Sequence, residues 1–146
     1  MEDARSTVPA HLVEVSAFFG EGYRPVLDFS GWRVAMLRHG PGLTAASLSR
    51  VERHRETNEV FILTAGCADL IIGDGDAIPT APVVVSMQPN VAYNIRQAVW
   101  HHVVMSPDAH IILVERSDTS RANSDYHPLT PADVARLQAQ LQPGVC

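Results

Sequence analysis

The 146 residues are enough for one domain, and 46% apolar with 18% charged residues is typical of a globular protein with a hydrophobic core. The formal net charge of −5 argues against nucleic acid or an anionic membrane as a partner, because both bind basic surfaces. We expect a cytoplasmic protein, since the sequence has neither a membrane-spanning apolar run nor the features of a signal peptide at its N-terminus.

Short apolar runs separated by Gly, Pro, Asn and Asp predict an all-β sandwich or barrel. We expect a single domain over residues 1–146, with its barrel core at about residues 26–116. Tight turns are predicted at Ala65-Gly66, Gly73–Asp76 and Pro89-Asn90. In chain order the predicted strands are Val26–Phe29, Trp32–Leu37, Ala46–Val51, Glu59–Thr64, Cys67–Ile72, Val83–Met87, Tyr93–Ile95, His101–Met105 and Ile111–Glu115.

Helix is predicted near the C-terminal end of the chain. Thr130 is a suitable N-cap, Pro131 suits the first helical position, and Pro143-Gly144 ends the segment. A weaker helical turn is predicted around His11–Phe19. Both segments would lie outside the sheets, where they cover a sheet edge or form a subunit contact.

The stretch from Glu52 to Gly66 carries the strongest functional signal. Glu52, His54 and Glu59 lie just ahead of an apolar strand or at its start, and His101 begins a later strand. All four side chains are potential metal ligands. Imidazole and carboxylate together suit one divalent transition metal per chain, which would be Fe, Mn, Ni, Co or Zn. The sequence indicates no organic cofactor.

The alternation of side chains along a strand predicts which residues share a pocket. Arg50, Glu52 and His54 share one face of their segment, and Glu59 and Phe61 share one face of the next. If both faces line the barrel interior, these side chains enclose one pocket. Buried charges there need partners, and a divalent metal is a natural one.

At these residues the chain resembles the cupin family. In the first cupin motif, two ligand histidines one residue apart are followed by a Glu, six residues and a Gly, and Glu59–Gly66 fits that spacing. His54 stands at the second histidine position, and Glu52 replaces the first histidine. The second motif resembles Asn90–Met105, where His101 holds the histidine position.

The resemblance covers about residues 46–115, and the later segment Asp118–Tyr126 is similar to small single-domain bacterial cupins. It implies a double-stranded β-helix, or jelly roll, with the site inside the barrel. It also implies a homodimer formed through N-terminal strands. Cupins include dioxygenases, isomerases, lyases, decarboxylases, cyclases and non-enzymatic binders, so the resemblance leaves the reaction open.

We expect a metal-dependent enzyme that acts on a small oxygenated or carboxylated metabolite by redox-neutral isomerisation, cyclisation, elimination or decarboxylation. Glu52 or Glu115 would move the proton, although Glu115 alternatively meets an arginine at the rim of the pocket. One alternative is an Fe(II)-dependent dioxygenase that uses His54, Glu59 and His101. The other is a non-enzymatic cupin that binds a small molecule.

Several residues have two interpretations. Glu52 is either the fourth metal ligand or a carboxylate that pairs with Arg50 or acts as a base. Arg50 either anchors an anionic substrate or is a solvated surface charge. Tyr93 and Trp100 are either core aromatics or, together with Phe61, part of the substrate-binding pocket.

Overall fold

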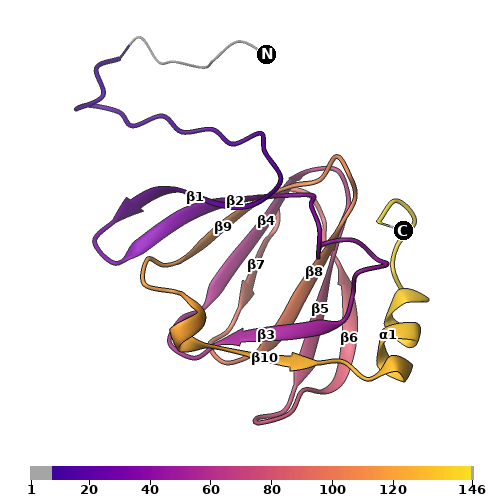
Figure 1. Ribbon diagram of the computed structural model, residues 1–146. Coiled ribbons are helices and arrows are strands. Elements are labelled where there is room, and N and C mark those ends of the chain that lie inside the picture. Colours follow the sequence, from indigo (N-terminus) through magenta and orange to yellow (C-terminus); the bar gives the residue numbers. More distant parts are fainter. Residues whose placement is uncertain (1–7, 146) are drawn as a thin grey trace.

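Two five-stranded antiparallel sheets face each other and form the barrel (Figure 1). The computed structural model describes residues 8–145. The first residues of the chain, on which the predicted cytoplasmic location partly rests, lie outside the described residues. Sheet A has the strand order β1-β2-β9-β4-β7, and sheet B has the order β10-β3-β8-β5-β6. The predicted all-β jelly roll is confirmed. The strands are β1 Gly22–Phe29, β2 Trp32–Arg38, β3 Arg50–His54, β4 Glu59–Ala65, β5 Ala68–Asp74, β6 Thr80–Ser86, β7 Ala92–Ile95, β8 Trp100–Met105, β9 His110–Arg116 and β10 Ser124–Pro128.

The strand predicted at Ala46–Val51 is wrong in its position. Residues 44–48 form turns, in which Thr44 and Ser47 exchange hydrogen bonds through their hydroxyl and backbone groups. The strand, β3, therefore begins only at Arg50 and continues to His54. This shift places the first metal-ligand candidates within a strand.

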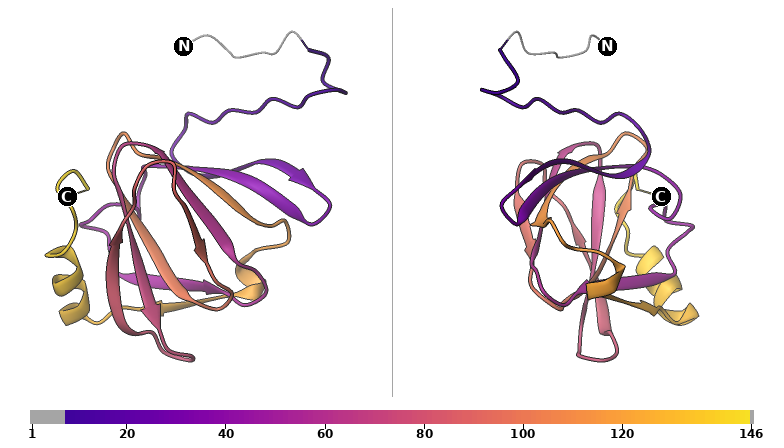
Figure 2. Two further views of the ribbon diagram at one scale, coloured as in Figure 1. Left: turned by 180° about the vertical axis from the view of Figure 1, so that it is seen from behind. Right: turned by 60° about the vertical axis from the view of Figure 1, so that its left-hand side comes forward.

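Two other segments also differ from their predictions. β10 lacks an apolar alternation that the sequence could reveal, and it forms because it pairs along its whole length with β3. The helical turn predicted at His11–Phe19 is wrong, because only one turn closes at Pro9 and the chain then runs extended away from the barrel (Figure 2). This segment meets the barrel through Ser16, Phe18 and Phe19, which contact β1 and β2. A helix that buries no apolar face would add little stability there.

Alternating side chains fill the space between the two sheets. On β8, Val103 and Met105 belong to the apolar core between the sheets, whereas Trp100 and Val104 pack on the outer face of sheet B. Because side chains alternate along a strand, the same pattern carries His101 into the barrel interior. The core packing therefore decides the direction of this candidate ligand.

One short helix covers the outer face of sheet B, beside β6 (Figures 1 and 2). The helix α1 spans Pro131–Gln138, and its N-cap Thr130 accepts a hydrogen bond from the backbone N–H of Asp133, as the sequence predicted. Leu137 and Leu141 bury their side chains in the apolar cluster below it. Among residues 8–145, no helix reaches the length and apolar character that a membrane span requires.

A buried carboxylate fastens the C-terminal segment to sheet B. Asp69 of β5 is fully buried, and its two carboxylate oxygens accept hydrogen bonds from the backbone and side-chain nitrogens of Gln142 at 2.7 and 2.6 Å. Hydrogen bonds to a buried charged group are stronger than neutral ones. The segment that follows the helix is thus held against the outer apolar cluster by a polar contact.

Three turns next to the site strands need a positive φ. Asn90 and Ala98 adopt φ values of 62° and 61° before β7 and β8, and Gly66 adopts 69° between β4 and β5. At Gly66 the restriction is also steric, because a Cβ atom there would lie 2.6 Å from the backbone of Ala109. This close approach packs the β4–β5 hairpin against the turn that precedes β9.

The substitution Gly66→Ala is expected to lower the free energy of unfolding by about 2–4 kcal/mol, through backbone strain and the overlap with Ala109 together. Gly31→Ala is the matched control, because Gly31 has a φ of 94° but no atom within 4 Å of its added Cβ. It should cost only about 1–2 kcal/mol. Urea unfolding measures both, and equal losses would contradict the steric argument.

Candidate metal centre

Three strands bring three buried side chains together inside the barrel. His54 ends β3, Glu59 begins β4, and His101 is the second residue of β8. Oε2 of Glu59 lies 3.1 Å from Nε2 of His54 and 3.0 Å from Nε2 of His101. Residues far apart in the sequence therefore meet around a single carboxylate oxygen, as their predicted ligand roles require.

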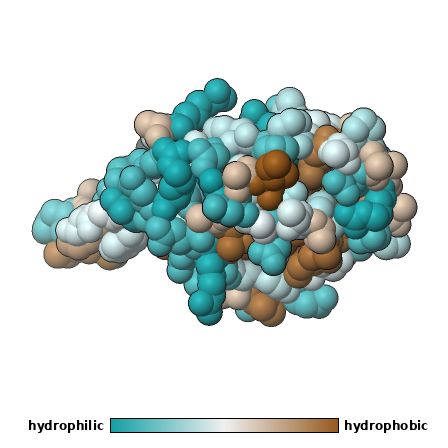
Figure 3. Space-filling model, turned by 90° about the horizontal axis from the view of Figure 1, so that it is seen from below, coloured by the Kyte–Doolittle hydropathy of each residue, from teal (hydrophilic) through white to brown (hydrophobic). Residues whose placement is uncertain are grey.

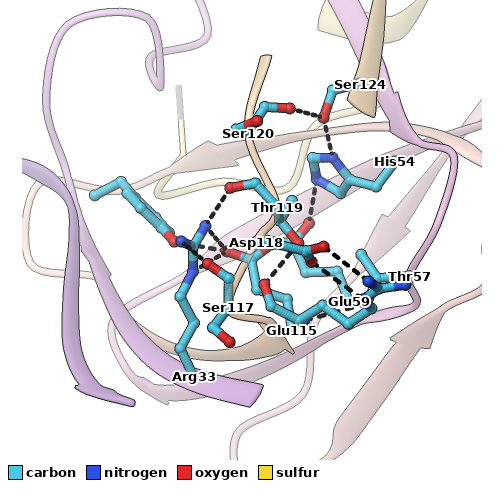
Figure 4. A network of polar contacts seen from close by, with 12 residues as sticks. Arg33, His54, Thr57, Glu59, Glu115, Ser117, Asp118, Thr119, Ser120 and Ser124 are labelled. Atoms are coloured by element: carbon cyan, nitrogen blue, oxygen red, sulfur yellow. Dashed lines mark hydrogen bonds and ion pairs between the residues drawn. The ribbon is translucent and has the colours of Figure 1, made fainter. Parts of the chain in front are cut away.

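The second ring nitrogens show where the protons of the two histidines lie. Nδ1 of His54 is 2.8 Å from Oγ of Ser124, whose own hydrogen is donated to the backbone oxygen of Ser120 (Figure 4). Nδ1 of His101 is 2.9 Å from a backbone carbonyl oxygen. Both partners can only accept, so both Nδ1 atoms carry a proton. In neutral rings, each Nε2 then presents a lone pair to the same carboxylate oxygen.

Two lone pairs that face a carboxylate need a positive charge between them. Protons can supply it: burial by itself lowers the pKa of His54 and of His101, but the hydrogen bond and negative charge of Glu59 raise both pKa values above the usual range. Burial by itself raises the pKa of Glu59, and its hydrogen bonds with the two histidines lower it overall. A divalent metal satisfies the same geometry, because metal ligands must give up their protons. The donor set of two imidazoles and a carboxylate fits a transition metal.

Two further carboxylates face the same point. The ligand atoms of Glu52, His54 and His101 lie within 4.8 Å of one another, and so do those of His54, Glu59 and Glu115. Three of the four predicted metal ligands, Glu52, His54 and His101, therefore form one group that could hold a metal ion, and Glu59 belongs with His54 to the second group. Glu115, predicted as an acid or base, is the third member of that second group.

Glu115 is held by two residues that the sequence did not single out. Its Oε1 accepts hydrogen bonds from the hydroxyl of Tyr23 at 2.6 Å and from Nε and Nη2 of Arg33 at 3.0 and 2.8 Å. Arg33 also donates to two backbone carbonyl oxygens after β9 (Figure 4). Burial and the charge of Glu59 raise the pKa of Glu115, whereas the bonds from Tyr23 and Arg33 oppose that rise. Glu115 does meet an arginine, but in the buried interior rather than at the rim.

The interior carries an excess of negative charge. Around the two histidines, the carboxylates of Glu52, Glu59 and Glu115 face the cavity together with the paired guanidinium of Arg33, whereas the other two arginines that line this cavity, Arg50 and Arg121, are exposed. With neutral imidazoles this leaves an excess of two negative charges. Buried charges are stable only when they are paired, and a divalent cation matches this excess.

These side chains line a cavity of about 580 Å³. Arg50 and Phe61, predicted to bind substrate, also line it, and the ring of Phe61 lies edge-on to His101 with centroids 5.9 Å apart. Tyr93 and Trp100 lie outside this cavity. Trp100 directly precedes His101, so strand alternation turns it to the outer face, and Tyr93 packs against the apolar core.

The chain after β9 supplies cavity residues that the sequence analysis assigned no role. Arg121 in the short 3₁₀ helix η1 (Arg121–Asn123) lines the cavity, as do Ser124 and Tyr126 of β10. The similarity of residues 118–126 to small bacterial cupins was the available signal. It could not place these side chains, because the pairing of β10 with β3 joins residues about seventy positions apart.

The comparisons with known proteins give structural neighbours only. No family model matches the chain, and a search of curated proteins found no match. A cupin-2 domain containing protein from Shewanella frigidimarina is 18% identical with a TM-score of 0.47, over 68% of this chain and 84% of that one. Pac13 of Streptomyces, a nucleoside dehydratase, is 7% identical with a TM-score of 0.54, over 80% and 87%. KdgF from Halomonas is 10% identical with a TM-score of 0.47, over 68% and 81%.

Metal binding is tested by elemental analysis of protein purified without added metal. We expect close to one transition metal per chain, and its loss in His54→Ala, because removing one imidazole ligand lowers metal affinity strongly. His11→Ala is the control, since His11 is an exposed histidine on the N-terminal segment. Equal metal content in all three proteins would contradict the assignment of His54 as a ligand.

Proposed function

Because the protein has the cupin fold with a histidine and carboxylate cluster inside the barrel, we propose that it is a metal-dependent enzyme. Its substrate is a small oxygenated or carboxylated molecule, and its reaction is redox-neutral proton transfer. The observation that carries the proposal is the convergence of two imidazole lone pairs and a carboxylate beside a separate proton-transfer group.

The ligands are His54, Glu59 and His101, with Glu52 as the fourth. A divalent transition metal bound there supplies a positive charge that stabilises a developing oxyanion on the substrate. Phe61 beside His101 limits the water around the ligands. The fixed Nδ1 bonds of the two histidines hold the rings in one orientation, which is how neighbouring groups tune a metal site.

Glu115 is the proton-transfer group in this proposal. One of its oxygens is held by Tyr23 and Arg33, and the other accepts no hydrogen bond from the residues that the structure describes. That free oxygen can take a proton from a carbon next to a carbonyl group, while the Tyr23 hydroxyl continues to donate its hydrogen bond to Oε1. Arg33 keeps the carboxylate in place during the transfer.

Deuterium incorporation tests this role without knowledge of the final product. Small hydroxy- and oxo-carboxylates are incubated with metal-loaded protein in D₂O, and exchange at the carbon next to the carbonyl is followed by proton NMR. Glu115→Gln should slow exchange by about 10²–10⁴-fold, the usual contribution of a positioned acid or base, with unchanged metal content. The control Glu56→Gln alters an exposed loop carboxylate and should exchange normally.

Equal exchange in the wild type and Glu115→Gln would remove Glu115 from the mechanism. Exchange that is also unaffected by His54→Ala would overturn the metal-dependent enzyme itself. Tight binding of a panel compound without any exchange or turnover would instead favour a non-enzymatic binder.

A second candidate, an Fe(II)-dependent dioxygenase, is supported by one observation. His54, Glu59 and His101 form a two-histidine, one-carboxylate set around one point, and such sets occur in non-haem iron oxygenases. We rank it second because Glu52 stands ready as a further ligand, which leaves fewer positions for oxygen. Turnover at the same rate without oxygen would exclude it.

We also propose a homodimer formed through the N-terminal segment. Residues 13–19 run extended with apolar side chains at alternate positions, and Val13, Val15 and Phe19 are exposed. Such a segment resembles an unpaired edge strand, which can pair with a strand of another chain. Figure 3 shows a face of the molecule, turned by 90° from the view of Figure 1, on which apolar side chains lie in separate patches among hydrophilic ones. Unlike the N-terminal segment, this face does not suggest a subunit contact.

Light scattering on wild-type protein should give the mass of a dimer. Val13→Asp combined with Val15→Asp should give a monomer, because charges at both positions oppose apolar burial. Ile78→Asp, at an exposed position in the β5–β6 turn, should leave the dimer intact. A wild-type monomer at every concentration tested would contradict the proposal.

A further inference from the structure

Two arginines at the cavity mouth have no carboxylate partner. Arg50 at the start of β3 and Arg121 in η1 both line the cavity and are exposed, which is what we call the mouth. Within residues 8–145, neither side chain forms an ion pair or a hydrogen bond. Both guanidinium groups instead lie over the ring of Tyr126, with Cζ atoms 4.7 and 5.9 Å from its centroid.

Most of the other arginines that the structure describes differ from these two, because they pair with carboxylates. Stacking on an aromatic ring orients a guanidinium group and leaves its N–H donors unused. Two oriented groups with free donors beside one cavity form a ready binding site for a carboxylate or phosphate. The arginines that do pair with carboxylates are Arg33, Arg53, Arg55, Arg116 and Arg136.

The strand register sets the distance between the mouth and the metal centre. Arg50, Glu52 and His54 are alternate residues of β3, and Tyr126 pairs with Glu52 across β10. At about 3.3 Å per residue, the Cα atom of Arg50 lies about 7 Å from that of Glu52 and about 13 Å from that of His54. The cavity therefore has a deep end with imidazoles and a shallow end with guanidinium groups.

The two ends also differ in charge. The deep end holds Glu52, Glu59 and Glu115 against one paired arginine, whereas the mouth holds the two unpaired cations. At the mouth an anionic group is attracted by both arginines, whereas at the deep end it is attracted only when a bound cation offsets the carboxylates. A ligand whose remote end is anionic can thus be held at the mouth by that end while its other end reaches the metal centre.

We propose that the substrate is an elongated molecule with a carboxylate or phosphate group at the end remote from the reacting oxygen. The anionic group binds Arg50 and Arg121 beside Tyr126, and the oxygenated end reaches the cluster of His54 and His101. This inference deepens the proposed function and rests on it for the orientation of the substrate. It narrows the substrate class to anions long enough to span the cavity.

A matched pair of probes tests the anionic subsite. 2-Oxoglutarate and 2-oxovalerate share the same oxo-acid head, but only the first carries a distal carboxylate. Calorimetric titration of zinc-loaded protein should show 2-oxoglutarate binding about tenfold more tightly or better, the usual worth of a charge-assisted hydrogen bond. Competition by inorganic phosphate and by acetate then shows whether the mouth prefers phosphate or carboxylate.

Arginine variants separate the mouth from a general charge effect. In the double variant Arg50→Gln with Arg121→Gln, the preference for 2-oxoglutarate should disappear, while the affinity for 2-oxovalerate and the zinc content stay unchanged. Arg24→Gln is the matched control, because Arg24 also stacks on an aromatic ring, that of Phe18, outside the cavity. A preference that survives in the double variant, or is lost equally in Arg24→Gln, would overturn the proposal.

The same titrations on metal-free protein distinguish this inference from the proposed function. If the protein binds zinc and its preference for 2-oxoglutarate is the same in the double arginine variant, the anionic subsite is contradicted and the metal-dependent function is not. An arginine-dependent preference in protein that binds no zinc would support the mouth and defeat the metal-dependent function.

Discussion

The site depends on one oxygen atom, Oε2 of Glu59, which lies against Nε2 of both His54 and His101. The outer nitrogens of the two rings are committed to acceptors, so the inner ones face this oxygen without protons when the rings are neutral. The arrangement requires a positive charge at the centre. A buried cluster that needs positive charge, supplied by protons on the histidines or by a cation, is well suited to hold a metal inside a barrel made of apolar side chains.

Around this point the fold places charges of opposite sign at different depths. Glu115 is fixed by Tyr23 and Arg33 on sheet A, close to the histidines. Arg50 stands on sheet B at the mouth, two alternations beyond His54 along β3. Because β3 pairs with β8 only at Glu52 and His101, the first part of β3 is free to border an opening rather than a continuous sheet. One strand thus contributes both to the deep cluster and to the mouth.

Both faces of sheet B are packed against other parts of the protein, and this fixes which side chains of each strand point to which face. Its inner face meets sheet A and the site, and its outer face packs under α1 and the C-terminal segment. A shift of β8 by one residue would exchange His101 with Trp100, placing an indole in the site and an imidazole under the helix. The outer cluster therefore contributes to the site although none of its residues is a candidate metal ligand.

The sequence by itself determined an all-β sandwich or barrel, most strands and the C-terminal helix, and the resemblance of its motifs to the cupin family predicted the jelly roll and grouped His54, Glu59 and His101. Alternation along strands and the spacing to Gly66 are local, and local patterns can be read from a chain. The tertiary structure alone decided the rest. The partners of Glu115, the role of β10, the mouth formed by Arg50 and Arg121, and the positions of Tyr93 and Trp100 outside the cavity all depend on pairing between distant strands. Such pairing is set by the packing of the whole barrel, so no short stretch of sequence contains it.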